Sequence, residues 1–207
     1  MLGNEINEHI RASLAILIES ADELRDLDQA LGDGDLGITI TAGSRAVITE
    51  LEALADDATP TEIARTCAKA FANANPSTMA ALVAGALLSG SRTWEGKSKI
   101  GQAEAADFVK AAAASIAQRG KTQVGDKTIL DGIDAAAEAL ASADDAVAAR
   151  ADVVDAAARA VRDTKDLQSR RGRASWLQER SIGLIDPGAT AFLRFVEAWS
   201  RVAADPE

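Results

Sequence analysis

Apolar residues recur every three or four positions along most of the chain, which is the spacing of one face of an α-helix. The stripe is clear in the first thirty residues and again in residues 146–168. In the first of these stretches it consists of Ile6, Ile10, Leu14, Leu17, Ala21 and Leu24. Residues 38–41 alternate as a strand would, but they follow a glycine and lead into a helical pattern. The pattern therefore predicts helices and no strands.

Three of the four prolines mark predicted helix starts, because each follows a residue that can cap a helix. These pairs are Thr59-Pro60, Asn75-Pro76 and Asp186-Pro187. Glu62 completes a capping box with Thr59. With these boundaries the sequence predicts eight helices, at residues 4–30, 37–55, 60–73, 76–92, 101–118, 127–142, 146–168 and 187–203.

Short connections between the helices predict an all-α, antiparallel up-and-down bundle, and the length predicts a single domain over residues 1–207. Hydrophobic residues make up 47% of the chain but aromatic residues only 3%, without any tyrosine. The core must therefore be built from Ala, Leu, Ile and Val on closely spaced helices. This composition also favours helix over strand.

Charge and cysteine content exclude several classes of function. A net charge of −10 argues against binding to nucleic acid or to an anionic membrane, because both require clustered positive charge. The single cysteine, Cys67, cannot form an internal disulfide and sits among alanines, as a core residue would. The longest apolar run, residues 79–88, is half a membrane span, and the N-terminus lacks a secretion signal. We expect a cytoplasmic protein.

The strongest candidate for chemistry is residues 27–37, where Asp28, Asp33 and Asp35 lie among three glycines. Carboxylates this close together repel one another unless water, protons or a cation screens them. Mg²⁺ and Ca²⁺ prefer oxygen ligands, and Mg²⁺ often completes its shell with substrate phosphates. The helical stripe also continues onto Asp28, which predicts an inward-pointing carboxylate that needs neutralisation. The three aspartates are therefore predicted metal ligands.

Three other interpretations of this stretch compete with a metal site. An EF-hand starting at Asp33 would need a glycine where Ile38 stands and a glutamate where Ser44 stands, so it fails. The spacing G-x-G-x-x-G is present, but no strand precedes it and the aspartates would repel a pyrophosphate. A solvated acidic turn is common for Asp-Gly pairs, yet it does not explain the inward position of Asp28.

The stretch resembles the signature of the dihydroxyacetone kinase L-subunit (DhaL/Dak2) family, which reads LD-x-x-x-GDGD followed by a further glycine. Further stretches match that family in order along the chain: residues 75–81 weakly, and residues 125–131, 172–175 and 179–189 closely. The resemblance implies an eight-helix barrel that carries its nucleotide and metal ions at one rim. It also implies an ADP- or ATP-binding kinase subunit with two Mg²⁺ ions.

Several further residues are expected at the nucleotide. Amides at the predicted helix starts suit phosphate oxygens, with ordinary capping as the alternative role of the serine and threonine. Arg180 is the preferred phosphate contact within the basic loop of residues 165–180, because guanidinium binds phosphate in a bidentate manner. The resemblance adds residues that flank the adenine or close over the nucleotide. The full expected set is Leu36, Gly37, Ile38, Thr39, Ser77, Thr78, Gly120, Ile129, Gly172, Arg180, Asp186, Pro187 and Gly188.

The resemblance also implies a partner, a K-type subunit that holds the ketose. The phosphoryl donor would be either ATP or a protein of the phosphotransferase system. The single histidine, His9, is expected on the polar side of the first helix, which leaves no second candidate for a phosphohistidine. The family has His or Cys and then Gly-Thr where this chain has Leu36, Gly37 and Ile38. Such departures keep two alternatives open: a nucleotide-binding regulatory module without turnover, and a fatty-acid-kinase-like subunit.

Overall fold

A computed structural model describes residues 1–204 of the chain, and within this range it is helical, without a strand. The predicted all-α fold is confirmed. Two short 3-10 helices, Thr164–Asp166 and Arg173–Ser181, interrupt the longest connection. The α-helices of this range are α1 (Gly3–Ile18), α2 (Ala21–Leu31), α3 (Leu36–Glu52), α4 (Pro60–Ala74), α5 (Thr78–Thr93), α6 (Gln102–Gly120), α7 (Ile129–Ser142), α8 (Ala146–Asp163) and α9 (Pro187–Ala204).

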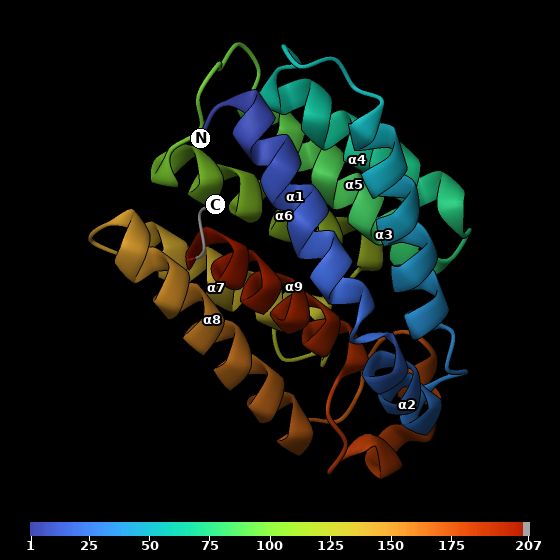
Figure 1. Cartoon of the computed structure of the whole chain (residues 1–207). Helices are drawn as coiled ribbons and strands as arrows, with labels where there is room; N and C mark the ends of the chain where they lie inside the picture. The colour runs from blue at the N-terminus through green and yellow to red at the C-terminus, as the bar shows by residue number, and fades with distance from the viewer. Residues whose placement is uncertain (205–207) are drawn as a thin grey trace.

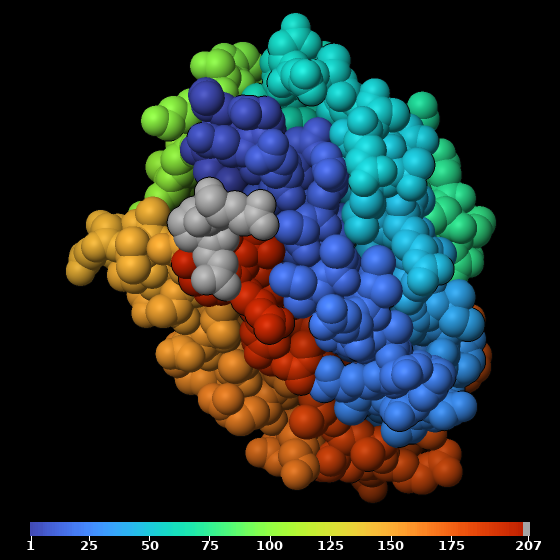
Figure 2. Space-filling view, viewed as in Figure 1, coloured from blue at the N-terminus to red at the C-terminus, as the bar shows by residue number. Residues whose placement is uncertain are grey.

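Eight of these helices form a closed ring. From α3 to α9 each long helix packs on its neighbours in the chain, α1 packs on α3, and α9 returns to pack on α1. Figure 1 shows α1 and α9 side by side, and the space-filling view in Figure 2 shows them sharing one face of the molecule with α8. The short α2 is an additional helix that packs on α3 at one end of the ring.

The up-and-down order decides which connections meet. Because successive long helices run in opposite directions, every second connection lies at the same end of the barrel. Residues 19–35, 75–77, 121–128 and 164–186 therefore share one end, which we call the acidic rim. Figure 1 shows α2 and the 3-10 helix at residues 173–181 together at this end.

The predicted first helix, residues 4–30, is wrong, because it is two helices. The amides of Glu19 and Ser20 donate to the carbonyls of Ile16 and Leu17, both at 3.0 Å, which tightens the chain into a turn between α1 and α2. The apolar stripe nevertheless continues across the turn, since Leu17 and Leu24 are both buried. A periodic stripe therefore did not reveal the break.

Proline-based boundaries were correct twice and wrong once. Pro60 and Pro187 are the first residues of α4 and α9, and the Thr59–Glu62 capping box is present. Helix α5 instead begins at Thr78, with Ser77 as the capping residue. Asn75 does not cap it, because its side-chain amide donates to the hydroxyl of Thr39 at 3.1 Å.

Other predicted boundaries also need correction. Helix α7 begins at Ile129, not at residue 127, because Thr128 caps it and Lys127 adopts a left-handed backbone with φ of 62°. The left-handed residue after α6 is Lys121, while Gly120 is the last residue inside the helix. Helix α8 ends at Asp163 and residues 164–166 form a 3-10 turn, so the predicted helix 146–168 was too long.

The core is built mainly from Leu, Ile, Val and Ala, as the composition predicted, and glycines let helices approach closely. A Cβ atom on Gly43 would lie 2.3 Å from the ring of Phe71, and one on Gly90 would lie 2.7 Å from Phe108. His9 is half-buried rather than exposed, because its ring lies 4.1 Å from that of Trp199. Within residues 1–204 no helix is long and apolar enough to cross a membrane.

Candidate metal and nucleotide site

The three predicted metal ligands meet at the acidic rim. Asp28 lies in the last turn of α2, Asp33 lies in the following loop, and Asp35 precedes α3. Each offers a carboxylate oxygen, and these oxygens all lie within 4.8 Å of one another. Gly34 adopts φ of 78°, a left-handed conformation that glycine tolerates and that folds the loop back on α2. The local sequence thus brings three oxygen donors to one point.

Asp28 lies in a partly buried environment that is unfavourable for a lone carboxylate. Asp28 is half-buried, and its Oδ2 accepts a hydrogen bond from the amide of Leu36 at 3.2 Å. Burial raises the pKa of Asp28, and the nearby carboxylates of Asp35 and Asp33 raise it further. A group in this setting favours a cation close by, because a positive charge would offset both effects. The donor set therefore fits a hard divalent cation.

A basic side chain from the far end of the chain reaches the same cluster. The Arg173 guanidinium pairs with the Asp33 carboxylate and lies 3.5 Å from Oδ2 of Asp35. The Asp33 charge raises the pKa of Arg173, with a smaller contribution from Asp35. The sequence had suggested Arg180 as the phosphate contact of this segment, and that assignment stays a prediction. Both arginines are exposed, and Arg173 contacts the aspartates of the cluster.

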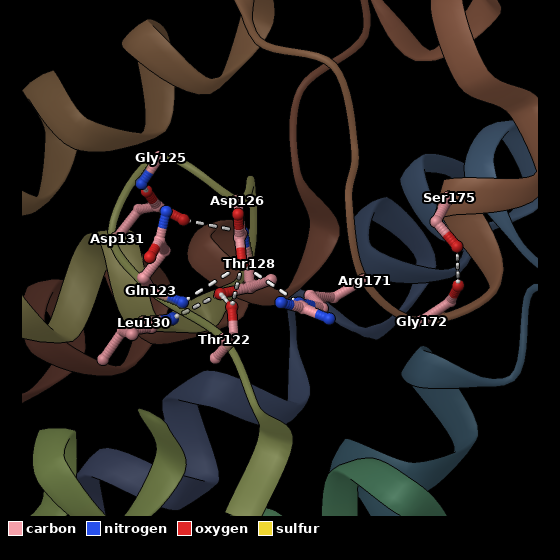
Figure 3. A network of polar contacts seen from close by, with 10 residues as sticks. All are labelled: Thr122, Gln123, Gly125, Asp126, Thr128, Leu130, Asp131, Arg171, Gly172 and Ser175. Carbon is pink, nitrogen blue, oxygen red and sulfur yellow. Dashed lines mark hydrogen bonds and ion pairs between the residues drawn. The ribbon is translucent and has the colours of Figure 1, made fainter. Parts of the chain in front are cut away.

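A second polar network fastens the segment that carries Arg173 to the connection before α7 (Figure 3). Oδ2 of Asp126 accepts hydrogen bonds from the amide of Gln123 at 3.1 Å and from Nε of Arg171 at 3.0 Å. Burial raises the pKa of Asp126, but the Gln123 amide and the Arg171 guanidinium outweigh it and hold this pKa below its ordinary value. Asp126 therefore tethers a neighbouring loop through Arg171 and does not cap α7.

Thr128 caps α7, and the other aspartate of the motif, Asp131, completes the capping box. The carboxylate of Asp131 accepts hydrogen bonds from the amides of Gly125 at 2.6 Å and Thr128 at 2.7 Å. The Thr128 hydroxyl in turn accepts from the amide of Leu130 at 3.2 Å. These reciprocal bonds fix the connection of residues 121–128 at the rim.

Two of the residues that the resemblance assigned to the nucleotide, Ile129 and Gly188, meet at the starts of their helices. A Cβ on Gly188 would lie 3.2 Å from Met79 and 3.3 Å from Ile129, so the starts of α5, α7 and α9 touch. Pro187 and Gly188 are buried there. Asp186 is also buried, and its Oδ2 accepts from the amide of Ala189 at 2.7 Å. Burial raises the pKa of Asp186 to about 7.

Some of the residues expected at the phosphates are buried, and others are exposed. Gly37 packs so tightly that an added Cβ would lie 2.2 Å from the carbonyl oxygen of Ala21, and Leu36 and Thr39 are buried. Ile38 is 64% exposed at the rim. The Ser77 hydroxyl accepts from the amide of Ala80 at 3.1 Å, which is the capping role weighed as the alternative. Thr78 and Gly172 are exposed, whereas Gly120 lies by Leu82.

Comparison with known proteins places this site in a family. A family model described as the DAK2 domain matches residues 30–201, which is most of the chain. The chain belongs to the DAK2 domain family. The resemblance found in the sequence motifs is thereby confirmed. Asp33, Asp35, the Arg173 segment and most of α9 lie within the matched range, and Asp28 lies two residues before it.

Relatives of two kinds share this DAK2 domain. The ADP-binding subunit DhaL of PEP-dependent dihydroxyacetone kinase 1 from Listeria innocua is 34% identical over 174 residues, covering 83% of this chain and 82% of that protein. L-erythrulose 1-kinase from Mycolicibacterium smegmatis is 33% identical over 191 residues, but the match covers 88% of this chain and only 33% of that protein. The domain thus occurs both as a separate subunit and as a third of a longer kinase.

A solved structure supports the fold. The dihydroxyacetone kinase from C. freundii, crystallised with AMP-PNP and Mg²⁺, superposes with a TM-score of 0.74 at 19% sequence identity. The match covers 97% of this chain and 34% of the longer kinase chain. At this identity the likeness establishes the helical fold, and residue roles must be argued from the site itself.

Proposed function

We propose that this DAK2-domain protein is the ADP/ATP-binding subunit of a kinase of the dihydroxyacetone kinase type, with the cytoplasm as its location. The observation that carries the proposal is the meeting of Asp28, Asp33 and Asp35 with Arg173 at one rim. The functions of the relatives, an ADP-binding subunit and an erythrulose kinase, support the same reaction class.

Metal binding falls to the three carboxylates in this proposal. Asp28, Asp33 and Asp35 would hold Mg²⁺, with two ions in the full complex, because oxygen donors within 4.8 Å of one another suit a hard cation. When bound, Mg²⁺ neutralises charge on the phosphates during transfer. None of the three carboxylates then needs to serve as an acid or base. The other residues of the rim position the nucleotide.

The nucleotide would lie between the acidic cluster and the starts of α5, α7 and α9. Ile129 and Gly188 form an apolar contact that suits the flat face of adenine. Gly120 is expected to flank the adenine from the end of α6. The guanidinium of Arg173, and that of Arg180 further along the segment, carry fixed positive charge with planar donors that match phosphate oxygens. Such charge is useful where negative charge develops on the moving phosphoryl group.

The acceptor would be a hydroxyl of dihydroxyacetone or a related short ketose held on a partner K-type subunit. Small ketoses need to be held in line with the phosphoryl group, and such positioning supplies roughly 7 to 11 kcal/mol of a barrier. The rim residues described above are engaged with metal, nucleotide or one another, which motivates a second protein as the holder. The donor is either ATP or a phosphotransferase-system protein that rephosphorylates bound ADP.

A two-part experiment tests the proposal. Calorimetry should show ADP binding in the presence of Mg²⁺ and its loss with a chelator. A transfer assay with a K-type subunit and dihydroxyacetone should then give ketose phosphate, while the isolated chain gives none. Absence of Mg²⁺-dependent nucleotide binding would refute the assignment. Binding without transfer to any supplied ketose would instead favour the regulatory alternative.

A further inference from the structure

Lys127 is a buried cation at the acidic rim, and it takes no part in the metal, nucleotide or capping contacts described above. Its side chain is only 1% exposed, and its backbone adopts the left-handed region with φ of 62°. That conformation is unfavourable for a residue with a side chain. Burying an ammonium is also costly unless each of its donors finds a partner. A residue that combines both costs needs an explanation.

The ammonium satisfies its donors in an unusual way. Nζ of Lys127 donates to three backbone carbonyls, those of Leu167 at 3.1 Å, Ser181 at 2.6 Å and Leu184 at 2.6 Å. An ammonium has three donors, so these bonds use its full capacity. The acceptors are not neighbours in the sequence. They lie at the two ends of the segment of residues 167–184.

This arrangement closes the segment into a loop with a fixed base. The base is reinforced by the amide of Gly183, which donates to the carbonyl of Lys165 at 2.7 Å, and by the amide of Ser169, which donates to the hydroxyl of Ser181 at 2.9 Å. Above the base, the Arg171 side chain holds Asp126, the residue that precedes Lys127. Two consecutive residues of the α6–α7 connection thus fasten the segment.

The far part of the same segment reaches the acidic cluster. Residues 173–181 form the 3-10 helix, and Arg173 at its start pairs with Asp33 and Asp35. Gly172, with φ of 64°, provides the bend between the fastened base and that helix. Where the base lies therefore decides where the guanidinium of Arg173 can reach.

We propose that Lys127 is a positioning residue: its ammonium binds both ends of the 167–184 segment and so holds Arg173 at the phosphoryl-transfer site. This inference rests on the proposed function for the transfer step. The binding of both ends of the segment by the Lys127 ammonium, which we call the Lys127 clamp, does not. The side-chain hydrogen bonds of Lys127 go to these three carbonyls, and the carboxylates of Asp186 and Asp166 lie close enough to favour its charged form.

Hydrogen–deuterium exchange of the ligand-free chain tests the clamp without any reaction. Lys127→Met keeps the length of the side chain and removes the charge. We expect amides of residues 167–184 to exchange at least about tenfold faster, since hydrogen bonds to charged groups are among the stronger ones. Exchange in the centres of α3 and α4 should stay unchanged. The matched control is Lys121→Met, because Lys121 is an exposed lysine with left-handed φ of 49° in the same connection.

A second variant keeps the test decisive if Lys127→Met does not fold. Lys127→Arg retains the charge, but its donors lie in a plane and cannot all converge on three carbonyls from one nitrogen. We expect faster exchange in residues 167–184 for this variant as well. Wild-type exchange in a folded Lys127→Met or Lys127→Arg protein would overturn the clamp.

A double-mutant cycle on phosphoryl transfer, measured with a K-type subunit, tests the positioning role. Arg173→Gln should lower the transfer rate in the wild-type background and have little further effect in the Lys127→Met background. Additive losses would show that Lys127 acts on the protein without acting through Arg173, which would overturn the proposal. A wild-type chain that transfers nothing would refute the proposed function instead, and exchange would still decide whether Lys127 holds the segment.

Discussion

Asp33→Asn is the sharpest test of the metal site, because it removes one charge from the cluster and preserves side-chain shape. In the ligand-free protein two effects oppose each other. The Asp33 carboxylate, 45% exposed, loses its ion pair with Arg173, and the repulsion that it exerts on Asp28 and Asp35 disappears. Exposed ion pairs contribute about 0–1 kcal/mol. The free energy of unfolding without ligand should therefore change by less than about 1 kcal/mol.

The effect with ligand should be much larger. A ligand at a hundredfold excess over its dissociation constant stabilises the folded state by about 2.7 kcal/mol. For a domain of this size, each kcal/mol raises the melting temperature by roughly 2–4 °C, so Mg²⁺ with ADP should raise it by roughly 5–11 °C in the wild type. Asp33→Asn should reduce that shift to under about 2 °C, because phosphates reach the cluster only through the metal.

Scanning calorimetry with Mg²⁺ and ADP, with each alone, and with a chelator measures this difference directly. Asp22→Asn is the matched control, since Asp22 is an 86% exposed aspartate of α2 that pairs with Arg25 instead. The control should keep the full wild-type shift. A folded Asp33→Asn protein with the same Mg²⁺-dependent shift as the wild type would refute the assignment of these carboxylates to metal.

Three other outcomes are expected. Burial raises the pKa of Asp186 from 3.8 to about 7, so the folded state binds this proton more tightly than the unfolded state, and stability falls as pH rises between these values. Urea unfolding across that range should show a smaller fall for Asp186→Asn. Leu24→Ala, at a fully buried position of α2, should cost about 2–5 kcal/mol in the same assay. Trp176→Ala, at an 80% exposed position on the rim, should change stability by less than about 0.5 kcal/mol yet weaken binding of a K-type subunit about tenfold or more, measured by calorimetry.

The fold could be predicted well because its signals are local. Apolar spacing and capping residues lie within a few positions of the helix ends that they define, so α4 and α9 began at the predicted residues. The break between α1 and α2 escaped prediction because the turn at Ser20 preserves the buried stripe. The start of α5 was misplaced because Asn75 was engaged by Thr39, a residue 36 positions away.

The candidate site could be predicted only in part, because several of its contacts join residues that are far apart in the sequence. The three aspartates lie close in sequence, and their mutual repulsion is visible from spacing alone. The contact of Arg173 with Asp35 joins residues 138 positions apart, so nothing local distinguished Arg173 from Arg180. Lys127 lies in a polar motif that is typical of an exposed turn, and its acceptors are 40 to 57 positions away. Its left-handed backbone was equally invisible, since lysine gives no sequence signal for that conformation.

The aspartates and Arg173 lie far apart in the sequence, so the site assembles only when two distant parts of the chain come together. The aspartates come from the connection after α1, and Arg173 comes from the connection before α9. These two parts of the chain meet because α9 packs on α1 and closes the ring. Substitutions that loosen the α1–α9 contact should therefore weaken the rim as well as the core, even at positions far from the aspartates. The barrel thus couples ring closure to the pairing of Arg173 with the metal-binding carboxylates.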